Sequence, residues 1–439
     1  MVTMNLFVET YGCQMNVSDS LKIGSLFIEQ GYEITGDYRQ ADLIVINTCS
    51  VREKPEQKLF SALGRYLPLK RKNPQLVVAV GGCVAQQWGP RLREKCPELD
   101  IVFGTHAIDR LPLMVQRVRN GDLSAVDTDF REAISSLDII PRYAAGTVAA
   151  FVTIMQGCNN FCSYCIVPHV RGREYSRSSA AIIEEVHQLA DQGIREVVLL
   201  GQNVNSYGLQ SPGECSFAEL LARVNGIAGI DRIRFTTSHP KDLSVELIEA
   251  YGSLDHLCPQ LHLPLQAGSD RILQRMGRGY TVADYLAKVD HLRRVCTTIS
   301  LSSDMIIGFP GETDSDFQQT LEMTRLVRYD TVFSFKYSPR PGTRAANFNE
   351  QVPEEVKKER LRQFQQLQDE ITAENLEAMV GSTREILVVG PAKRGERQWV
   401  GRTGGSQIVN FFAPRDHTGS LLTVRITAAL RHSLRGEVF

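Results

Sequence analysis

The sequence predicts an α/β protein with three parts: an N-terminal parallel α/β domain, a partial (β/α)6 barrel and a small C-terminal β-barrel. Three observations predict this fold class. Apolar, strand-like runs alternate with helix-like stretches over residues 1–120, a second alternating series covers residues 147–375, and residues 376–439 change to short β-rich runs. Alternation favours parallel sheets with crossover helices, whereas many short strands separated by Gly and Pro favour a β-barrel.

The N-terminal part contains four strand-like runs, and helical stretches follow the first three. The strands are expected at residues 5–9, 42–47, 76–81 and 101–103, and the helices are expected to begin near Val17, Glu53 and Ala85. Residues 121–146 break this pattern because they are rich in acidic residues and contain Pro141. We therefore expect a linker there.

The central part contains six strand-like runs. They lie at residues 150–156, 196–201, 231–237, 259–265, 299–307 and 331–337, with helical spacing at 180–192 and 314–327. Six parallel strands suit an incomplete barrel better than the full eight-stranded one.

The C-terminal part begins after a predicted helix over residues 353–379, where apolar residues recur on one face. Its short strands are expected at residues 384–389, 399–402, 408–412 and 421–428. From residue 376 it holds nine Lys and Arg against five Asp and Glu, a difference of +4. The four cations Lys393, Arg394, Arg397 and Arg402 could bind phosphates or form a solvated face.

Composition indicates a cytoplasmic protein without a membrane span. The 439 residues include 49 Lys and Arg against 50 Asp and Glu, so the net charge of −1 does not by itself indicate a nucleic-acid partner. The N-terminus lacks the features of a secretory signal, and no run approaches the roughly 18 apolar residues that a membrane helix needs. The ten cysteines are therefore expected to be reduced thiols.

Three cysteines, Cys158, Cys162 and Cys165, follow an apolar run with the spacing C-x3-C-x2-C in GCNNFCSYC. Thiolates this close favour an iron–sulfur cluster or zinc. Zinc with His169 as a fourth ligand is the alternative. A 4Fe–4S cluster held by three cysteines would leave one iron open to a small molecule, as catalytic metal sites do.

Another three cysteines, Cys13, Cys49 and Cys83, each follow an apolar run: FVETYGC, IVINTC and VVAVGGC. In a parallel sheet the residues just past the strand ends share one edge, so these three thiols could hold a second cluster. The alternative is three buried core cysteines. Cys96, Cys215, Cys258 and Cys296 share no such spacing and are expected to be structural thiols.

The C-x3-C-x2-C motif with Tyr164 before its third cysteine resembles the radical S-adenosylmethionine superfamily. The resemblance implies a 4Fe–4S cluster whose open iron binds S-adenosylmethionine, which is cleaved to a radical that abstracts hydrogen. Residues 306–312, IIGFPGE, are similar to the superfamily segment near the adenine. We expect Tyr164, Gln202, Gln266 and Asp304 to contact the cofactor.

The whole chain resembles the methylthiotransferase family. This resemblance implies that Cys13, Cys49 and Cys83 hold an auxiliary 4Fe–4S cluster carrying the sulfur to be inserted, and that the C-terminal part is an RNA-binding TRAM domain. One S-adenosylmethionine would methylate that sulfur and a second would supply the radical. The implied partners are a tRNA substrate, a reductant such as flavodoxin or ferredoxin, and sulfur-supply or cluster-assembly proteins. We expect a monomer.

The segments YGCQMN at 11–16, NTCSVRE at 47–53 and the stretch at 155–177 are similar to the branch of the family that acts at C2 of N6-dimethylallyladenosine at position 37 of tRNA. Residues 14–16 and 50–53 distinguish this branch from those acting on threonylcarbamoyladenosine or a ribosomal protein. An iron–sulfur RNA-binding protein or electron carrier without catalysis is the alternative of another class. Arg171, Arg173 and Arg177 could meet RNA phosphates or anchor the cysteine loop.

Overall fold

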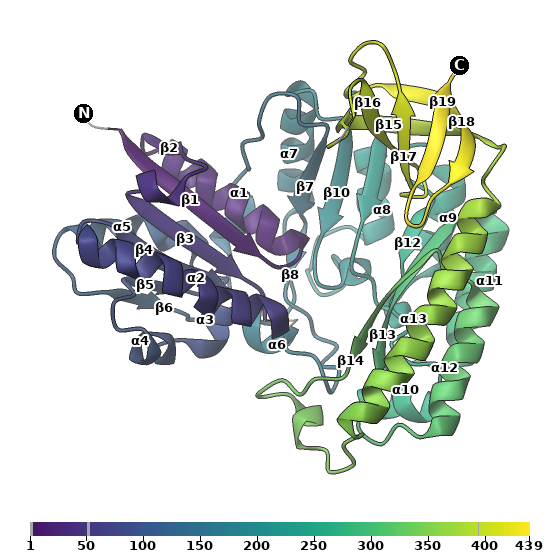
Figure 1. Ribbon diagram of the computed structural model, residues 1–439, viewed down its shortest axis with the longest axis horizontal. Coiled ribbons are helices and arrows are strands. Elements are labelled where there is room, and N and C mark those ends of the chain that lie inside the picture. The colour runs from purple at the N-terminus through teal and green to yellow at the C-terminus, as the bar shows by residue number, and fades with distance from the viewer. Residues whose placement is uncertain (1–2, 51–52, 394) are drawn as a thin grey trace.

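The computed structural model describes residues 3–50, 53–393 and 395–439 in three parts that lie against one another (Figure 1). The N-terminal α/β domain, in purple and blue, lies beside the partial barrel in teal and green. The small yellow barrel lies at the amino-terminal ends of β7, β10 and β11. Arg232, which begins β11, donates a hydrogen bond to the carbonyl of Arg402 in the small barrel. This arrangement confirms the expected fold class.

The N-terminal sheet is parallel and has the order β2-β1-β3-β4-β5-β6. Its strands are β1 (Met4–Tyr11), β2 (Tyr32–Ile34), β3 (Leu43–Thr48), β4 (Val77–Gly82), β5 (Ile101–Phe103) and β6 (Ala125–Asp127). The four expected strands are present, whereas β2 and β6 were not predicted. Because β6 falls inside residues 121–146, the expected linker contains a strand of the first domain.

Helices cover both faces of this sheet. They are α1 (Gln14–Ile28), α2 (Glu53–Lys72), α3 (Cys83–Trp88), α4 (Arg91–Lys95) and α5 (Leu111–Arg119). Alternate residues of β3 serve the two cores: Leu43 and Val45 pack with α1 and α5, while Ile44 and Ile46 pack with α2. Burial on both faces explains why the central strands are continuous apolar runs.

The central part contains the six expected strands in two parallel three-stranded sheets, β11-β10-β7 and β12-β13-β14. The sheets meet at the bridge between Ile233 and Leu257. The strands are β7 (Ala149–Thr153), β10 (Glu196–Leu200), β11 (Arg232–Phe235), β12 (Gln260–His262), β13 (Ser300–Ile307) and β14 (Thr331–Lys336). A two-stranded hairpin, β8 (Met155–Gln156) and β9 (Tyr175–Ser176), frames the Cys158–Cys165 loop.

Apart from the short helix α6, which packs against α3 of the N-terminal domain, the helices of this part pack on one face of the curved sheet, and the other face is concave. Val197 and Leu199 of β10 lie in the core with the helices, whereas Val198 and Leu200 point to the concave face. The helices are α6 (Val167–Val170), α7 (Ser179–Asp191), α8 (Phe217–Asn225), α9 (Val245–Ser253), α10 (Asp270–Met276), α11 (Val282–Val295), α12 (Asp314–Val327) and α13 (Glu354–Glu377). Short 3-10 turns are η1 (Tyr38–Gln40), η2 (Ile108–Arg110), η3 (Ser135–Asp138), η4 (Val204–Ser206), η5 (Pro240–Asp242) and η6 (Arg344–Asn347).

The C-terminal part is a closed barrel with the order β15-β16-β17-β19-β18. Its strands are β15 (Thr383–Pro391), β16 (Gln398–Thr403), β17 (Ile408–Phe412), β18 (Leu421–Ala429) and β19 (Leu434–Val438), of which β19 was not predicted. Arg234 fixes the barrel to β11, because its buried guanidinium donates to the carbonyls of Thr403 and Gly404, each at 2.7 Å. Within the described part of the chain, none of the helices has the length and apolar content of a membrane span.

Candidate cluster and cofactor sites

The fold brings Cys13, Cys49 and Cys83 to one edge of the N-terminal sheet. In the strand register, Tyr11 lies opposite Thr48, and Thr48 lies opposite Gly82. Each of the three cysteines comes within two residues of these aligned strand ends. The sheet therefore places three thiols, distant in sequence, side by side at its carboxyl edge.

Glycines allow the close approach of these loops. A Cβ atom on Gly12 would lie 2.6 Å from Cβ of Cys49, and one on Gly82 would lie 2.5 Å from the carbonyl oxygen of Thr48. Gly82 also has φ of +86°, which residues with a side chain adopt at a cost. Any larger residue at these two positions would push the cysteine loops apart.

The thiol of Cys49 lies within hydrogen-bonding distance of the thiols of both Cys13 and Cys83. The hydrogen bond with Cys49 lowers the pKa of Cys13 to about 6 and the pKa of Cys83 to about 7, and it raises the pKa of Cys49 itself. Burial acts against ionisation at all three positions. The pKa values of Cys13 and Cys83 are thus shifted toward the thiolate, the form that binds metal.

A buried arginine from the central part reaches this triad. Arg171 Nη2 lies 2.7 Å from Oδ2 of Asp19, and both side chains are buried. The Arg171 charge lowers the pKa of Cys13 and of Cys83, and its side chain also hydrogen-bonds to Cys83. The guanidinium would balance the negative charge of bound thiolates.

The Cys158–Cys165 loop is linked to the first triad by the residues that follow it. Ile166 and Val170 pack against Cys83. Thr105 Oγ1 donates to the Val170 carbonyl at 2.8 Å, and a ring nitrogen of His106 lies 3.0 Å from the Arg171 carbonyl. One short segment around α6 therefore connects the two cysteine triads across the domain boundary.

The second triad lies on a compact, partly buried loop. Gly157 has φ of +83°, and a Cβ there would lie 2.0 Å from the Arg173 carbonyl. The loop is fixed by a hydrogen bond from the Ser163 amide to the Met276 carbonyl at 2.8 Å. Burial raises the pKa of Cys158 to about 11 and the pKa of Cys165 to about 12.

Two residues beside Cys162 were not predicted from the sequence. Arg278 Nη1 donates to Sγ of Cys162 at 3.3 Å, and Nε2 of His239 lies 3.9 Å from the same sulfur. Both side chains are buried. Nothing in the local sequence marks His239, whereas the two glycines that flank Arg278, both with positive φ, are a weak signal for a constrained residue.

The four expected cofactor contacts lie around the barrel mouth or on its concave face. The Tyr164 hydroxyl accepts a hydrogen bond from Arg278 at 3.4 Å, and Oε1 of Gln202 accepts one from the Gly157 amide at 2.5 Å. Gln266 follows β12 with φ of +77°. Asp304 Oδ2 lies 3.4 Å from Nε2 of His262.

Several buried polar atoms at this mouth have no hydrogen-bond partner among the described residues. The atoms are Gln156 Nε2, Asn205 Nδ2 and Oδ1, Ser238 Oγ and Gln266 Oε1. Each of these residues comes shortly after the carboxyl end of a strand of the central part. Buried polar atoms are otherwise nearly always paired. Their grouping fits a ligand that is itself rich in donors and acceptors, as S-adenosylmethionine is with its amine, carboxylate and ribose hydroxyls.

The donor chemistry of both triads fits iron–sulfur clusters. A cluster spreads its thiolate ligands over separate iron atoms, so the sulfurs need not converge on one point. Across residues 3–50, 53–393 and 395–439, no group of three or more His, Cys, Asp or Glu side chains is placed to hold a metal ion. His169 lies at an exposed position of α6, after the cysteine loop.

The arginines after the second triad anchor the loop. Arg171 pairs with Asp19, and Arg177 pairs with Glu185 and, at 2.7 Å, with Asp138. Both arginines are buried and cannot meet RNA phosphates. Arg173, by contrast, is exposed with its guanidinium 5.6 Å from the centre of the Phe161 ring. Of the segments expected to distinguish the family branches, residues 51 and 52 lie outside the described residues, as does Arg394 of the expected basic face.

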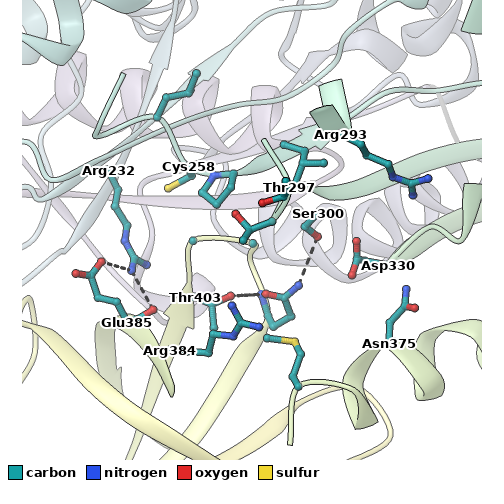
Figure 2. Close-up of a pocket in the computed structure, with 18 of the residues that line it drawn as sticks. Arg232, Cys258, Arg293, Thr297, Ser300, Asp330, Asn375, Arg384, Glu385 and Thr403 are labelled. Atoms are coloured by element: carbon teal, nitrogen blue, oxygen red, sulfur yellow. Dashed lines mark hydrogen bonds and ion pairs between the residues drawn. The ribbon is translucent and has the colours of Figure 1, made fainter. Parts of the chain in front are cut away.

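A cavity of about 700 Å³, whose lining includes Cys258 but no cysteine of either triad, lies between the central part and the small barrel (Figure 2). Figure 2 shows Arg232 bound to Glu385 and a glutamine that links Thr403 to Ser300. The acidic side chains of its wall, among them Asp330 and Glu385, offset its arginines. It therefore has the character of a polar domain junction.

Three family models match the chain. Residues 5–104 match the uncharacterized protein family UPF0004, residues 152–324 match the radical SAM superfamily, and residues 377–439 match the TRAM domain. The curated relatives include the tRNA-2-methylthio-N(6)-dimethylallyladenosine synthase of Syntrophus aciditrophicus, 51% identical over 99% of this chain and 94% of the relative. The protein of the same name from Geobacter metallireducens is 52% identical over 99% of this chain and 98% of the relative.

Solved structures agree on the fold. The radical S-adenosylmethionine methyltransferase TsrM from Kitasatospora setae has a TM-score of 0.60 over 79% of this chain and 77% of that chain, at 14% identity. The cobalamin-dependent radical enzyme OxsB has a TM-score of 0.55 over 82% of this chain and 56% of that chain, at 12% identity.

Proposed function

The chain belongs to the family of tRNA-2-methylthio-N(6)-dimethylallyladenosine synthases, and from this premise we propose that it attaches a methylthio group to C2 of N6-dimethylallyladenosine at position 37 of tRNA. The observation that carries the proposal is the pair of cysteine triads connected through α6. In each triad three thiols would hold a 4Fe–4S cluster and leave one iron without a protein ligand. A protein that only carries electrons would normally supply a fourth cysteine to each cluster.

The proposed ligands are Cys13, Cys49 and Cys83 for the auxiliary cluster and Cys158, Cys162 and Cys165 for the radical cluster. When bound, the clusters and S-adenosylmethionine supply the sulfur, its methyl group and the radical chemistry that an unreactive aromatic C–H bond requires. Arg171 and Arg278 balance thiolate charge from buried positions.

The remaining residues of the mouth orient the cofactor and exclude water. Gln202 holds the cysteine loop through the Gly157 amide. Gln266 and Asp304, joined by a hydrogen bond from the Gln266 amide to the Asp304 carbonyl, place polar groups on neighbouring strands toward the cofactor. Tyr164 closes the side next to Arg278.

The small barrel is proposed to bind the tRNA. We propose further that the chain works as a cytoplasmic monomer, that flavodoxin or ferredoxin reduces it, and that sulfur-supply or cluster-assembly proteins reload it. These partners follow from the chemistry, because each turnover consumes electrons and one sulfur atom.

The test uses the full chain, reconstituted anaerobically with iron and sulfide. Reduced protein, S-adenosylmethionine and tRNA containing N6-dimethylallyladenosine are combined, and the nucleosides are analysed by mass spectrometry. The expected result is 2-methylthio-N6-dimethylallyladenosine together with 5′-deoxyadenosine. A parallel reaction uses tRNA containing threonylcarbamoyladenosine. Methylthiolation of that tRNA, with none on the dimethylallyladenosine tRNA, would overturn the substrate assignment.

A further inference from the structure

A cavity of about 320 Å³ lies where the three parts of the chain meet. Gln14 lines it from the N-terminal domain, Phe151 and Val198 line it from the concave face of the central sheet, and Leu387 and Val389 line it from the small barrel. It is separate from the 700 Å³ cavity, with which it shares no lining residue. A space shared by three domains that act on one RNA is a natural place for part of the substrate.

The strand register orders the concave face into layers. Glu196 lies one step below Val198, and Leu200 lies one step above it at the carboxyl end of β10. The lowest layer is charged, because Glu196 pairs with Arg234, which the turn of the small barrel covers. In the middle layer Val198 lies between Phe151 and Arg234, and the guanidinium of Arg234 is bonded to Glu196 and to the small barrel, so Phe151 and Val198 form its apolar surface. The cavity therefore has a polar floor and an apolar wall.

The small barrel adds to the apolar wall. The register between β15 and β16 shifts between Val388 and Gly390, so Val389 is the extra residue of a β-bulge. Bulges redirect a side chain, and Val389 points outward with 48% of its surface exposed. Val388, its neighbour, is fully buried in the barrel core. The bulge thus presents an apolar side chain to the cavity.

One residue of the cavity wall, Gln14, adjoins the auxiliary sulfur site in the sequence. Gln14 directly follows Cys13, and the next residue, Met15, packs against Val198 and Leu200. A substrate carbon that receives sulfur from this site must lie near Cys13. Groups attached to the same base would extend into the adjoining space.

We propose that this cavity receives the dimethylallyl arm on N6 of the substrate adenosine and so selects it; the proposal rests on the proposed function. Two residues along a strand span about 7 Å. The layer of Val198 therefore lies about 7 Å below the mouth of the barrel, within reach of a branched five-carbon arm. The chemistry of the arm matches Phe151, Val198 and Val389.

The polar groups of the cavity argue against a charged arm in the same place. Gln14 is neutral, and the Arg234 guanidinium already donates to Glu196, Gln260 and two carbonyls. Arg402, the remaining cation of the lining, is offset by the charge of Glu196 in the same lining. A threonylcarbamoyl arm would bring its carboxylate against the apolar layer.

The experiment measures binding of three anticodon stem–loop RNAs that differ only at the target base: adenosine, N6-dimethylallyladenosine and threonylcarbamoyladenosine. The reconstituted full chain is titrated into each labelled RNA, and fluorescence anisotropy gives the Kd. We expect wild type to prefer the dimethylallyl RNA over the unmodified RNA by about tenfold or more, the scale of a few methylene groups in an apolar pocket.

Two variants test the wall. Val389→Ser removes an exposed apolar group, and Val198→Thr keeps the volume while adding a hydroxyl. Each should lower the preference about threefold to tenfold and leave the Kd of the unmodified RNA unchanged. Val438→Ser is the matched control, because Val438 is a partly exposed valine of the same barrel that does not line the cavity.

The inference is overturned if both wall variants keep the wild-type preference, or if threonylcarbamoyl RNA binds as tightly as dimethylallyl RNA. Failure of the proposed function gives a different result: wild-type protein would form no methylthio product on any dimethylallyl RNA. Wild type that forms product, with a preference insensitive to Val389→Ser and Val198→Thr, contradicts the inference alone.

Discussion

The two cysteine triads are connected through the segment around α6 but are built in opposite ways. Cys13, Cys49 and Cys83 come from three loops of a parallel sheet, and their thiols are close enough to share hydrogen bonds. Cys158 and Cys165 come from one loop, where burial raises their pKa. The auxiliary site therefore depends on the whole N-terminal sheet, whereas the radical site depends on one loop and the residues that hold it.

Each triad has one buried arginine, and these arginines differ as well. Arg171 is paired with Asp19. Arg278 donates to Cys162, to Tyr164 and to the Pro264 carbonyl, and no carboxylate in the described part of the chain lies within ion-pair distance of it. The first arginine is neutralised by the protein, whereas the second is neutralised only by ionised thiols.

Single cysteine substitutions should separate the two sites with the largest effect. Cys162→Ala and Cys49→Ala should each lower iron from about eight to about four atoms per chain, since each site holds four. Cys162→Ala should abolish formation of 5′-deoxyadenosine, whereas Cys49→Ala should retain part of it and form no methylthio product. Iron analysis and chromatography of the nucleosides give both readouts. Sulfur insertion by Cys49→Ala at the wild-type rate would show that the auxiliary site is misassigned.

Glycine substitutions should separate the two modes of construction. Gly82→Ala should displace Cys83, because its Cβ would lie 2.5 Å from the Thr48 carbonyl oxygen, and Gly157→Ala should displace Cys158, because its Cβ would lie 2.0 Å from the Arg173 carbonyl oxygen. Each should cost about 1–3 kcal/mol of stability and about half of the bound iron.

Absorption and electron paramagnetic resonance spectra of the reconstituted variants identify which cluster is lost. Gly64→Ala is the control, because Gly64 lies in α2 with no atom within 4 Å of the added Cβ. We expect this control to be neutral or slightly stabilising. Loss of the radical cluster in Gly82→Ala would contradict the independence of the two sites.

The arginines should differ in the stability of the cluster-free protein. Arg171→Gln leaves Asp19 as an unpaired buried charge and should lower the free energy of unfolding by about 3–5 kcal/mol. Arg278→Gln removes a buried cation without stranding a carboxylate, so its loss should be smaller by at least about 1 kcal/mol. Urea denaturation under anaerobic conditions measures both. The double variant Asp19→Asn, Arg171→Gln should recover part of the first loss, and equal losses in the two single variants would refute the distinction.

Sequence reasoning predicted the parts of this fold that repeat a pattern. The central strands β3, β4 and β10 are buried on both faces, so they are continuous apolar runs. The position of Cys13, Cys49 and Cys83 after such runs was enough to predict one shared edge, because parallel strands end at the same side.

Residues without a local pattern were missed. The strands β2 and β6 are three residues long and contain exposed positions, so no periodicity marks them. Arg278 reaches Cys162 from 116 positions away in the sequence. Only the packing of α10 against the cysteine loop, through Ser163 and Met276, creates that contact. Side-chain partners set by tertiary packing cannot be read from spacing along the chain.

The smallest expected effect concerns pH on the radical side of the mouth. Glu312 follows β13 in the segment similar to the adenine-binding one, and burial raises its pKa from 4.5 to about 7 despite Arg360 at 2.8 Å. The folded state therefore binds this proton more tightly than the unfolded state. The resulting stability is fully present below pH 4.5 and is lost as pH rises through about 7, at up to about 1.4 kcal/mol per pH unit.

Glu312→Gln should remove this dependence, because the amide stays neutral and Arg360 keeps Asp314 as a partner at 2.6 Å. Urea denaturation of the cluster-free protein at pH 5, 6 and 7 measures the difference between wild type and variant. The variant should gain stability relative to wild type as pH rises, whereas the control Glu370→Gln, at an exposed position of α13, should track wild type. A constant offset between wild type and Glu312→Gln would mean that Glu312 stays ionised in the fold. The Arg360 pair would then outweigh burial, and this side of the mouth would hold a fixed charge as Asp19 does beside the auxiliary thiols.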